Sequence, residues 1–189
     1  MAEIRNISTQ SVNEYGDLKL NFRTIGDMKA FCRYVLRGNQ TERPLFSLSR
    51  GFISSTDNPD EISSEMQSIQ ELYRKTKGIR IRGEIAVIEK EKLGEDKLSE
   101  IKDIAFAFAG YYMDRGYQTA YGIYDAKDCF EIRYAINTVS YADGAKYRHN
   151  NADIYEQEEQ SLNTVVADVR GLDIPDEERF DFETLEYHQ

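Results

Sequence analysis

The sequence has few of the residues that build metal sites and cross-linked domains. It contains only two histidines, His149 and His188, so a site made of three imidazoles cannot be assembled from this chain. Its two cysteines, Cys32 and Cys129, lack the spacing of a zinc knuckle or a disulfide framework. We therefore expect two free thiols and no bound metal or other cofactor.

Long apolar runs are also missing. No stretch approaches the roughly 18 uncharged apolar residues that a membrane-spanning helix needs. The opening MAEIRNISTQ has neither the basic nor the apolar region of a signal peptide. We expect a cytoplasmic protein without a membrane partner. The length of 189 residues suits one core, so we predict a single domain over residues 1–172 and an acidic tail over residues 173–189.

The net charge of −10 is unevenly distributed. Residues 151–189 hold 12 of the 34 acidic side chains and 2 of the 24 basic ones, which leaves 22 of each in residues 1–150. A neutral body argues against a protein that coats DNA, because such affinity comes from lysine and arginine. The acidic end is either a solvated, disordered segment or a surface for a basic protein groove. Its candidate contact residues are Asp176, Glu177, Glu178 and Asp181.

Apolar periodicity and capping residues predict four helices, and period-two alternation predicts three strands. The helices are expected at 27–37, from 59 to just before Gly78, at about 96–115 and at about 152–170. The strands are expected at 79–88, 117–125 and 130–137, the last two forming a hairpin through the turn AKDC. This pattern predicts an α+β domain, a central antiparallel sheet with helices packed mainly on one face. The other face should be open and carry these polar or aromatic side chains: Arg80, Arg82, Glu84, Tyr124, Glu131 and Arg133.

The segment YGIYDAKDCFEIRYAINTVSYADGAKY, residues 121–147, resembles the metal-binding hairpin of relaxases, the DNA-nicking mobilisation nucleases of plasmids and integrative elements. AFCRYVLRGNQTERP resembles the family's first motif, with its tyrosine at Tyr34, and EMQSIQELYRKTKG resembles its second helix. The resemblance covers about residues 28–150 and implies a relaxase-like fold.

The hairpin departs from the family where the chemistry is done. The family places three histidines at the positions of Tyr124, Glu131 and Arg133. Relaxases use the metal held there to polarise the scissile phosphate while a tyrosine attacks it. The departure predicts that DNA nicking is lost, and Tyr34 is then either a packed helix tyrosine or a surviving nucleophile.

Three interpretations of the altered hairpin remain open. Arg133 and Glu131 form either a weak surface ion pair or a phosphate site in which Arg133 replaces the metal. In the second case Arg80, Arg82, Lys146 and Arg148 extend the contact with nucleic acid. In the third, Asp125, Asp128 and Glu131 ligate magnesium. RNA carries its own 2′-hydroxyl nucleophile, so Glu131 as base, Arg133 as clamp and Tyr124 as proton donor would suffice to cleave it.

We expect the function of a relaxase-derived protein of a bacterial mobile element that inhibits host defence. It would engage an RNA-guided nuclease or its guide RNA, as anti-CRISPR proteins do, because the basic channels of such nucleases suit an acidic tail. The alternatives are a metal-independent RNA endonuclease acting on guide RNA and an accessory DNA-binding domain for plasmid mobilisation, which would bind single-stranded nucleic acid.

Overall fold

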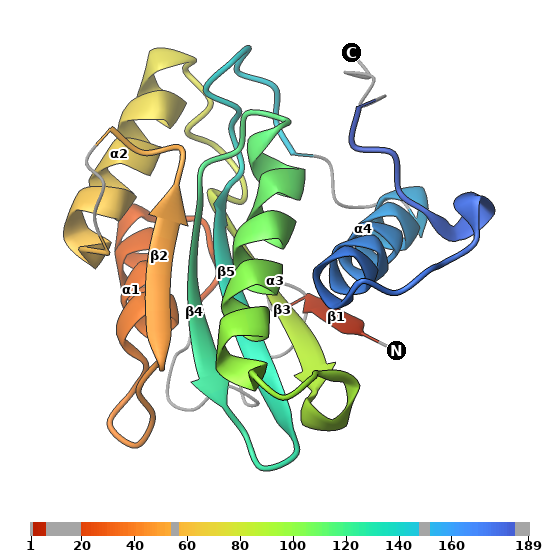
Figure 1. The fold of residues 1–189 in the computed structure, drawn as a ribbon. Helices are drawn as coiled ribbons and strands as arrows, with labels where there is room; N and C mark the ends of the chain where they lie inside the picture. The colour runs from red at the N-terminus through yellow and green to blue at the C-terminus, as the bar shows by residue number, and fades with distance from the viewer. Residues whose placement is uncertain (1, 7–19, 54–56, 148–151, 184–189) are drawn as a thin grey trace.

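A five-stranded sheet and four helices make up the chain in the computed structural model, which describes residues 2–6, 20–53, 57–147 and 152–183 (Figure 1). The strands are β1 (Glu3–Asn6), β2 (Phe46–Arg50), β3 (Ile81–Glu89), β4 (Thr119–Asp125) and β5 (Cys129–Asn137). The helices are α1 (Ile25–Arg37), α2 (Pro59–Leu72), α3 (Lys97–Met113) and α4 (Ala152–Arg170), with short 3-10 turns η2 (Lys90–Lys92) and η3 (Asp176–Glu178). No helix in these ranges is long and apolar enough to cross a membrane.

The sheet is antiparallel throughout, in the order β1-β3-β5-β4-β2. The α+β class, the antiparallel sheet and the hairpin of β4 and β5 are confirmed. The register pairs Tyr124 with Glu131, as the short turn predicts. The edge strands β1 and β2 have no counterpart among the predicted strands, because each is too short to show a clear alternation.

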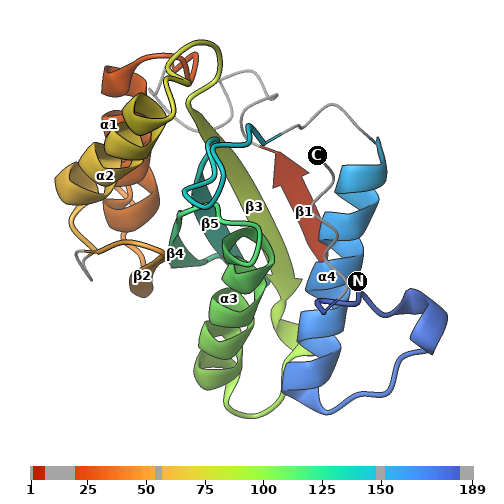
Figure 2. The same ribbon diagram turned by 90° about the horizontal axis from the view of Figure 1, so that it is seen from above.

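Helices cover both faces of the sheet (Figure 2). On one face, α1 and α2 pack over Ile81, Ile85, Ala120 and Ala135. On the other, α3 packs over the apolar side chains of β4 and β5, including Ile123, Ile132 and Tyr134, and α4 packs beside α3 and against β1. The expectation of an open polar face is therefore wrong. Five of its six members are buried, namely Arg80, Arg82, Glu84, Tyr124 and Arg133, and Glu131 is half-buried.

The predicted open face also combined residues that lie on opposite sides of the sheet. Ile85 is the Cα partner of Arg133, so the odd positions of β3 share the face of Arg133 under α1 and α2. Arg82 and Glu84 have the opposite parity and face α4 instead. Alternation within one strand says nothing about which face it shares with its neighbour, and only the register decides this.

Helix boundaries follow the caps closely. The helix expected from Asp27 begins at Ile25, because Thr24 is the N-cap and Asp27 closes a capping box as its third residue. Asn58 and Pro59 start α2 as predicted, but this helix ends at Leu72, well before Gly78. Asp96 caps α3, and Gly116 follows it with a φ of 83°. The fourth helix occupies Ala152–Arg170, the range expected.

Candidate functional site

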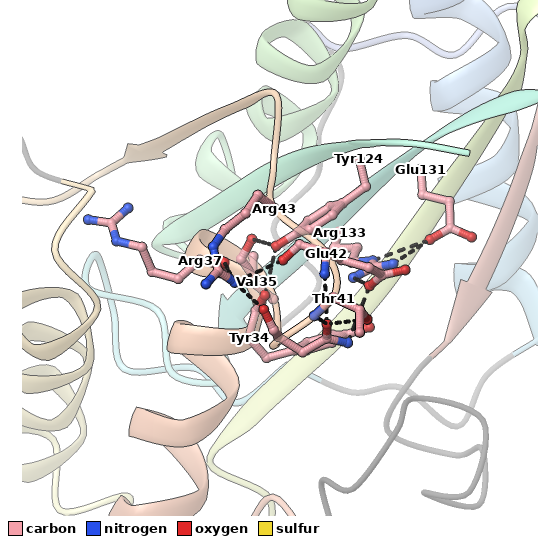
Figure 3. Close-up of polar contacts among 10 residues, drawn as sticks. Tyr34, Val35, Arg37, Thr41, Glu42, Arg43, Tyr124, Glu131 and Arg133 are labelled. Carbon is pink, nitrogen blue, oxygen red and sulfur yellow. Dashed lines mark hydrogen bonds and ion pairs between the residues drawn. The ribbon is translucent and has the colours of Figure 1, made fainter. Parts of the chain in front are cut away.

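The three residues that the sequence resemblance matches to relaxase histidines lie together on the face of the sheet covered by α1 (Figure 3). Tyr124 is the Cα partner of Glu131, and Arg133 is the partner of Gly122, two residues before Tyr124. The alternation of both strands turns all three side chains to the same side. The structure thus brings together Tyr124, Glu131 and Arg133, and adds Tyr34 from α1.

Arg133 is enclosed by two carboxylates and two aromatic rings. Its Nη1 donates to Glu42 Oε2 at 3.0 Å, and its Nε and Nη2 donate to Glu131 Oε2 at 3.2 and 2.9 Å. The guanidinium lies 3.8 Å from the ring centroid of Tyr124 and 5.0 Å from that of Tyr34. Only 5% of Arg133 is exposed. The interpretation as an exposed surface ion pair is therefore wrong.

Charge balance holds Arg133 in its ionised form. Burial alone would lower the pKa of Arg133, but hydrogen bonds to Glu42 and Glu131 raise it above its ordinary value. Glu42 and Glu131 remain partly exposed, with 46% and 26% of their side chains accessible. The guanidinium of Arg133 is therefore shielded from solvent, whereas the carboxylates of Glu42 and Glu131 are accessible to it.

Tyr124 completes the C-terminal end of α1. Its hydroxyl lies 2.8 Å from the carbonyl oxygens of both Tyr34 and Val35 and donates to them. Tyr34 O also accepts from Gly38 N at 2.9 Å. The last carbonyls of a helix lack partners within the helix, so the Tyr124 hydroxyl supplies the donor that Val35 O needs. Burial raises the pKa of Tyr124 to about 12 and also raises the pKa of Tyr34. Neither hydroxyl is prepared to lose a proton near neutral pH.

The loop between α1 and β2 places Glu42 over Arg133. Asn39 Oδ1 accepts hydrogen bonds from Thr41 N at 2.8 Å and Glu42 N at 2.9 Å, which folds the loop into a tight turn. Gly38 begins this turn with a φ of 74°, and a Cβ there would lie 2.2 Å from the carbonyl oxygen of Glu42. Because Arg133 Nη1 donates to Glu42 in this loop, Arg133 holds the loop against the sheet.

This arrangement gives little support to phosphate chemistry at the hairpin. A phosphate would have to displace Glu42 or Glu131 and reach a guanidinium that is almost wholly buried. The proton of Tyr124 is committed to backbone carbonyls, and Tyr34 is 4% exposed. The residues expected to act as base, clamp, proton donor and nucleophile lie where α1 meets the sheet, and their polar groups contact one another, Glu42 and the backbone of α1.

A magnesium site at Asp125, Asp128 and Glu131 is not formed. Asp125 and Glu131 belong to opposite faces of the hairpin, since Asp125 pairs with Phe130 in the register. Asp125 forms an ion pair with Lys90, Nζ to Oδ1 at 2.5 Å. Within the described ranges no three side chains of His, Cys, Asp or Glu are grouped as metal ligands would be. The two cysteines, Cys32 and Cys129, are free thiols.

Arg82, expected to contact nucleic acid, belongs to an internal ion-pair cluster. It pairs with Glu84 beside it and with Glu158 of α4, Nη2 to Oε1 at 3.0 Å, while Tyr147 covers its guanidinium at 4.4 Å. Tyr147 also donates to Glu158 Oε1 at 2.6 Å. Arg82 is 2% exposed and both acids are fully buried. Arg82 therefore links α4 to the sheet and is out of reach of a macromolecule.

Arg80 and Lys146 meet at another edge of the molecule. Lys146 Nζ donates to the carbonyl oxygens of Lys77 and Ile79 at 2.6 and 3.0 Å. Arg80 Nε donates to Gln70 Oε1 at 2.7 Å. Arg80 precedes Ile85, the partner of Arg133, by five residues, or roughly 16 Å of strand. Arg148, the fourth expected contact, lies outside the described residues.

The acidic C-terminal segment folds back onto the domain. Phe180 N donates to Thr164 Oγ1 at 2.8 Å, and the Phe180 ring packs 5.3 Å from Tyr111. Arg179 pairs with Asp168 at 2.6 Å, Nη2 to Oδ1. Asp176, Glu177, Glu178 and Asp181 are exposed. The described part of the segment, residues 173–183, is thus anchored by aromatic packing while these carboxylates face solvent.

Two partners of the buried arginines were not identified from the sequence. Glu42 lies in a loop, and its pairing with Arg133 spans 91 positions. Glu158 lies on a helix with an amphipathic sequence pattern, where a glutamate is ordinarily solvent-facing. A different signal is visible in the sequence: from Tyr73 to Gly83 there is no acidic residue, yet there are five basic ones.

Comparison with known proteins adds no assignment, since no family model, curated protein or solved structure matches the chain.

Proposed function

We propose that this protein is a relaxase-derived binding protein of a mobile element that inhibits host defence by engaging an RNA-guided nuclease. The observation that carries the proposal is the acidic segment, which presents Asp176, Glu177 and Glu178 on η3. These three carboxylates form no ion pair within the described residues. A basic channel built to hold nucleic acid is the complementary partner.

Anchoring of the segment favours binding. Phe180 and Arg179 attach the segment to Thr164 and Asp168 of α4. Gln160 Nε2, also on α4, donates to Arg179 O at 3.1 Å. A surface that is already ordered loses less conformational entropy on association than a free tail does. Its carboxylates would also steer encounter with a positively charged groove.

The RNA endonuclease alternative receives less support from the geometry. It needs Arg133 to face a phosphate and Tyr124 to give up a proton, whereas Arg133 is enclosed and Tyr124 donates to α1. For this reason we place the activity in binding and assign the hairpin a structural role.

Charge neutralisation tests the proposal. The parent chain and the variant D176N/E177Q/E178Q/D181N would be compared for binding to an immobilised, guide-loaded type II nuclease over a series of salt concentrations. We expect weaker binding by the variant, with the difference shrinking as salt rises, because exposed charges are screened beyond about 8 Å at physiological ionic strength. Substitution is preferable to truncation after Leu172, since truncation also removes the packing of Phe180.

The matched control is E91Q/E95Q/D103N/D128N, which removes the same charge from four exposed acids elsewhere. It should bind like the parent. Equal loss by the two quadruple variants would assign the effect to net charge, and unchanged binding by the first would remove the acidic segment from the interface.

A further inference from the structure

Basic side chains gather without acidic partners at the turn between α2 and β3. We call this group the basic turn; it consists of Arg74, Lys75, Lys77, Arg80 and Lys146. The first three are exposed, Lys146 is half-buried and Arg80 is buried. None of the five forms an ion pair with an acid in the described ranges. In a chain with a net charge of −10, this local excess of cations is unusual.

The folded backbone holds these cations close together. Lys146 Nζ is fixed beneath the turn by the carbonyl oxygens of Lys77 and Ile79. Burial, with the positive charges of Arg80 and Lys75, lowers the pKa of Lys146. Neighbouring like charges raise the energy of the free protein, and a bound anion relieves their repulsion.

Arg80 is the buried member of the basic turn, below its exposed cations. It is 7% exposed, and while its Nε donates to Gln70, its buried Nη2 has no acceptor within the described part of the chain. A buried guanidinium that lacks a carboxylate leaves its positive charge uncompensated, which strengthens the potential at the surface above it. The one acid on the adjoining turn, Asp143, accepts from Ala145 N at 2.9 Å and does not pair with the cations.

We infer that the basic turn binds successive phosphates of a nucleic acid strand. Several exposed cations lie along one turn, above the buried Arg80. Such a row can contact several phosphates of one strand, whereas a single small anion would use only part of it. The site is separate from the hairpin, because Arg80 lies roughly 16 Å along β3 from the strand position paired with Arg133. The site also does not involve the acidic segment. Binding of nucleic acid there does not require the nuclease partner of the proposed function.

The test uses the full chain and fluorescence anisotropy of a labelled oligouridylate at several salt concentrations. The variant K75Q/K77Q changes two exposed positions, so it should keep the fold. Its thermal unfolding midpoint, compared with that of the parent, checks this. We expect the slope of log affinity against log salt to fall by about 1.4, and affinity to fall about tenfold at physiological salt. The matched control K92Q/K127Q removes two exposed lysines elsewhere and should bind like the parent.

Three results would overturn the inference. The first is no measurable binding of the oligouridylate by the parent chain at low salt. The second is an equal loss of affinity in K75Q/K77Q and K92Q/K127Q, which would reduce the effect to net charge. The third is competition by inorganic phosphate at concentrations comparable to those of the oligonucleotide, which would indicate a site for a single anion. Each result leaves binding to the nuclease through the acidic segment untouched.

Discussion

Arg133 occupies a position that the sequence resemblance matches to a relaxase metal ligand, and its surroundings are those of a structural cation. Two carboxylates accept its hydrogen bonds, and the rings of Tyr124 and Tyr34 lie against its guanidinium. A side chain in such a position contributes through both charge and packing. Its removal should therefore be felt in folding.

Replacement of Arg133 by alanine should lower the free energy of unfolding by about 1–3 kcal/mol, because aromatic packing and the link to the Gly38–Pro44 loop are lost together. Glu131→Gln should cost less, since Glu42 still pairs with the guanidinium. Urea denaturation of the parent and both variants measures the two losses. Parent-like stability of Arg133→Ala would contradict the structural role.

At the scale of elements, the junction of α1 with β4 depends on one glycine. A Cβ on Gly122 would lie 2.2 Å from the carbonyl oxygen of Val35, so the end of α1 can sit on the sheet only where β4 has no side chain. The same approach brings the Tyr124 hydroxyl to the carbonyl oxygens of Tyr34 and Val35. Gly122 therefore sets the distance at which the hairpin cluster forms.

Gly122→Ala should destabilise the fold by about 1–3 kcal/mol through overpacking against rigid backbone. Gly26→Ala is the matched control, since a Cβ there meets nothing closer than 3.7 Å and alanine favours the helix. The midpoint of thermal unfolding should fall for Gly122→Ala and should rise or stay unchanged for Gly26→Ala. Equal midpoints for Gly122→Ala and the parent would mean that α1 is held by other contacts.

The sequence predicts the elements better than their layers. Caps and periodicity locate α1, α3 and α4 within two residues, and the short turn fixes the pairing of Tyr124 with Glu131. The burial of Arg82 and Arg133 is not predictable from alternation, because their partners Glu158 and Glu42 are distant in the chain. Polar residues on a strand look solvent-facing until the register and the second helical layer are known.

At the scale of the whole molecule, tyrosines fill much of the core. Burial raises the pKa values of Tyr111, Tyr117, Tyr121 and Tyr124 to about 12 from the ordinary value of 10. The folded state therefore keeps their protons at pH values where the unfolded chain would release them. The resulting contribution to stability is complete below about pH 10 and is lost as the pH rises through about 12.

We accordingly expect the free energy of unfolding to fall steeply between about pH 10 and about pH 12, with tyrosinate absorbance rising together with unfolding. An alkaline titration followed by absorbance and circular dichroism measures both. Full tyrosine ionisation near pH 10 with the fold retained would mean that these hydroxyls are accessible to water.

The most direct test of the account is protection of target DNA from a guide-loaded type II nuclease, with the guide RNA recovered and sized afterwards. We expect the parent and Glu131→Gln to protect the DNA equally and to leave the guide RNA at full length. We expect D176N/E177Q/E178Q/D181N to lose protection at physiological salt. Absence of protection by the parent, or guide RNA shortened by the parent and left intact by Glu131→Gln, would contradict a binding protein whose hairpin is structural.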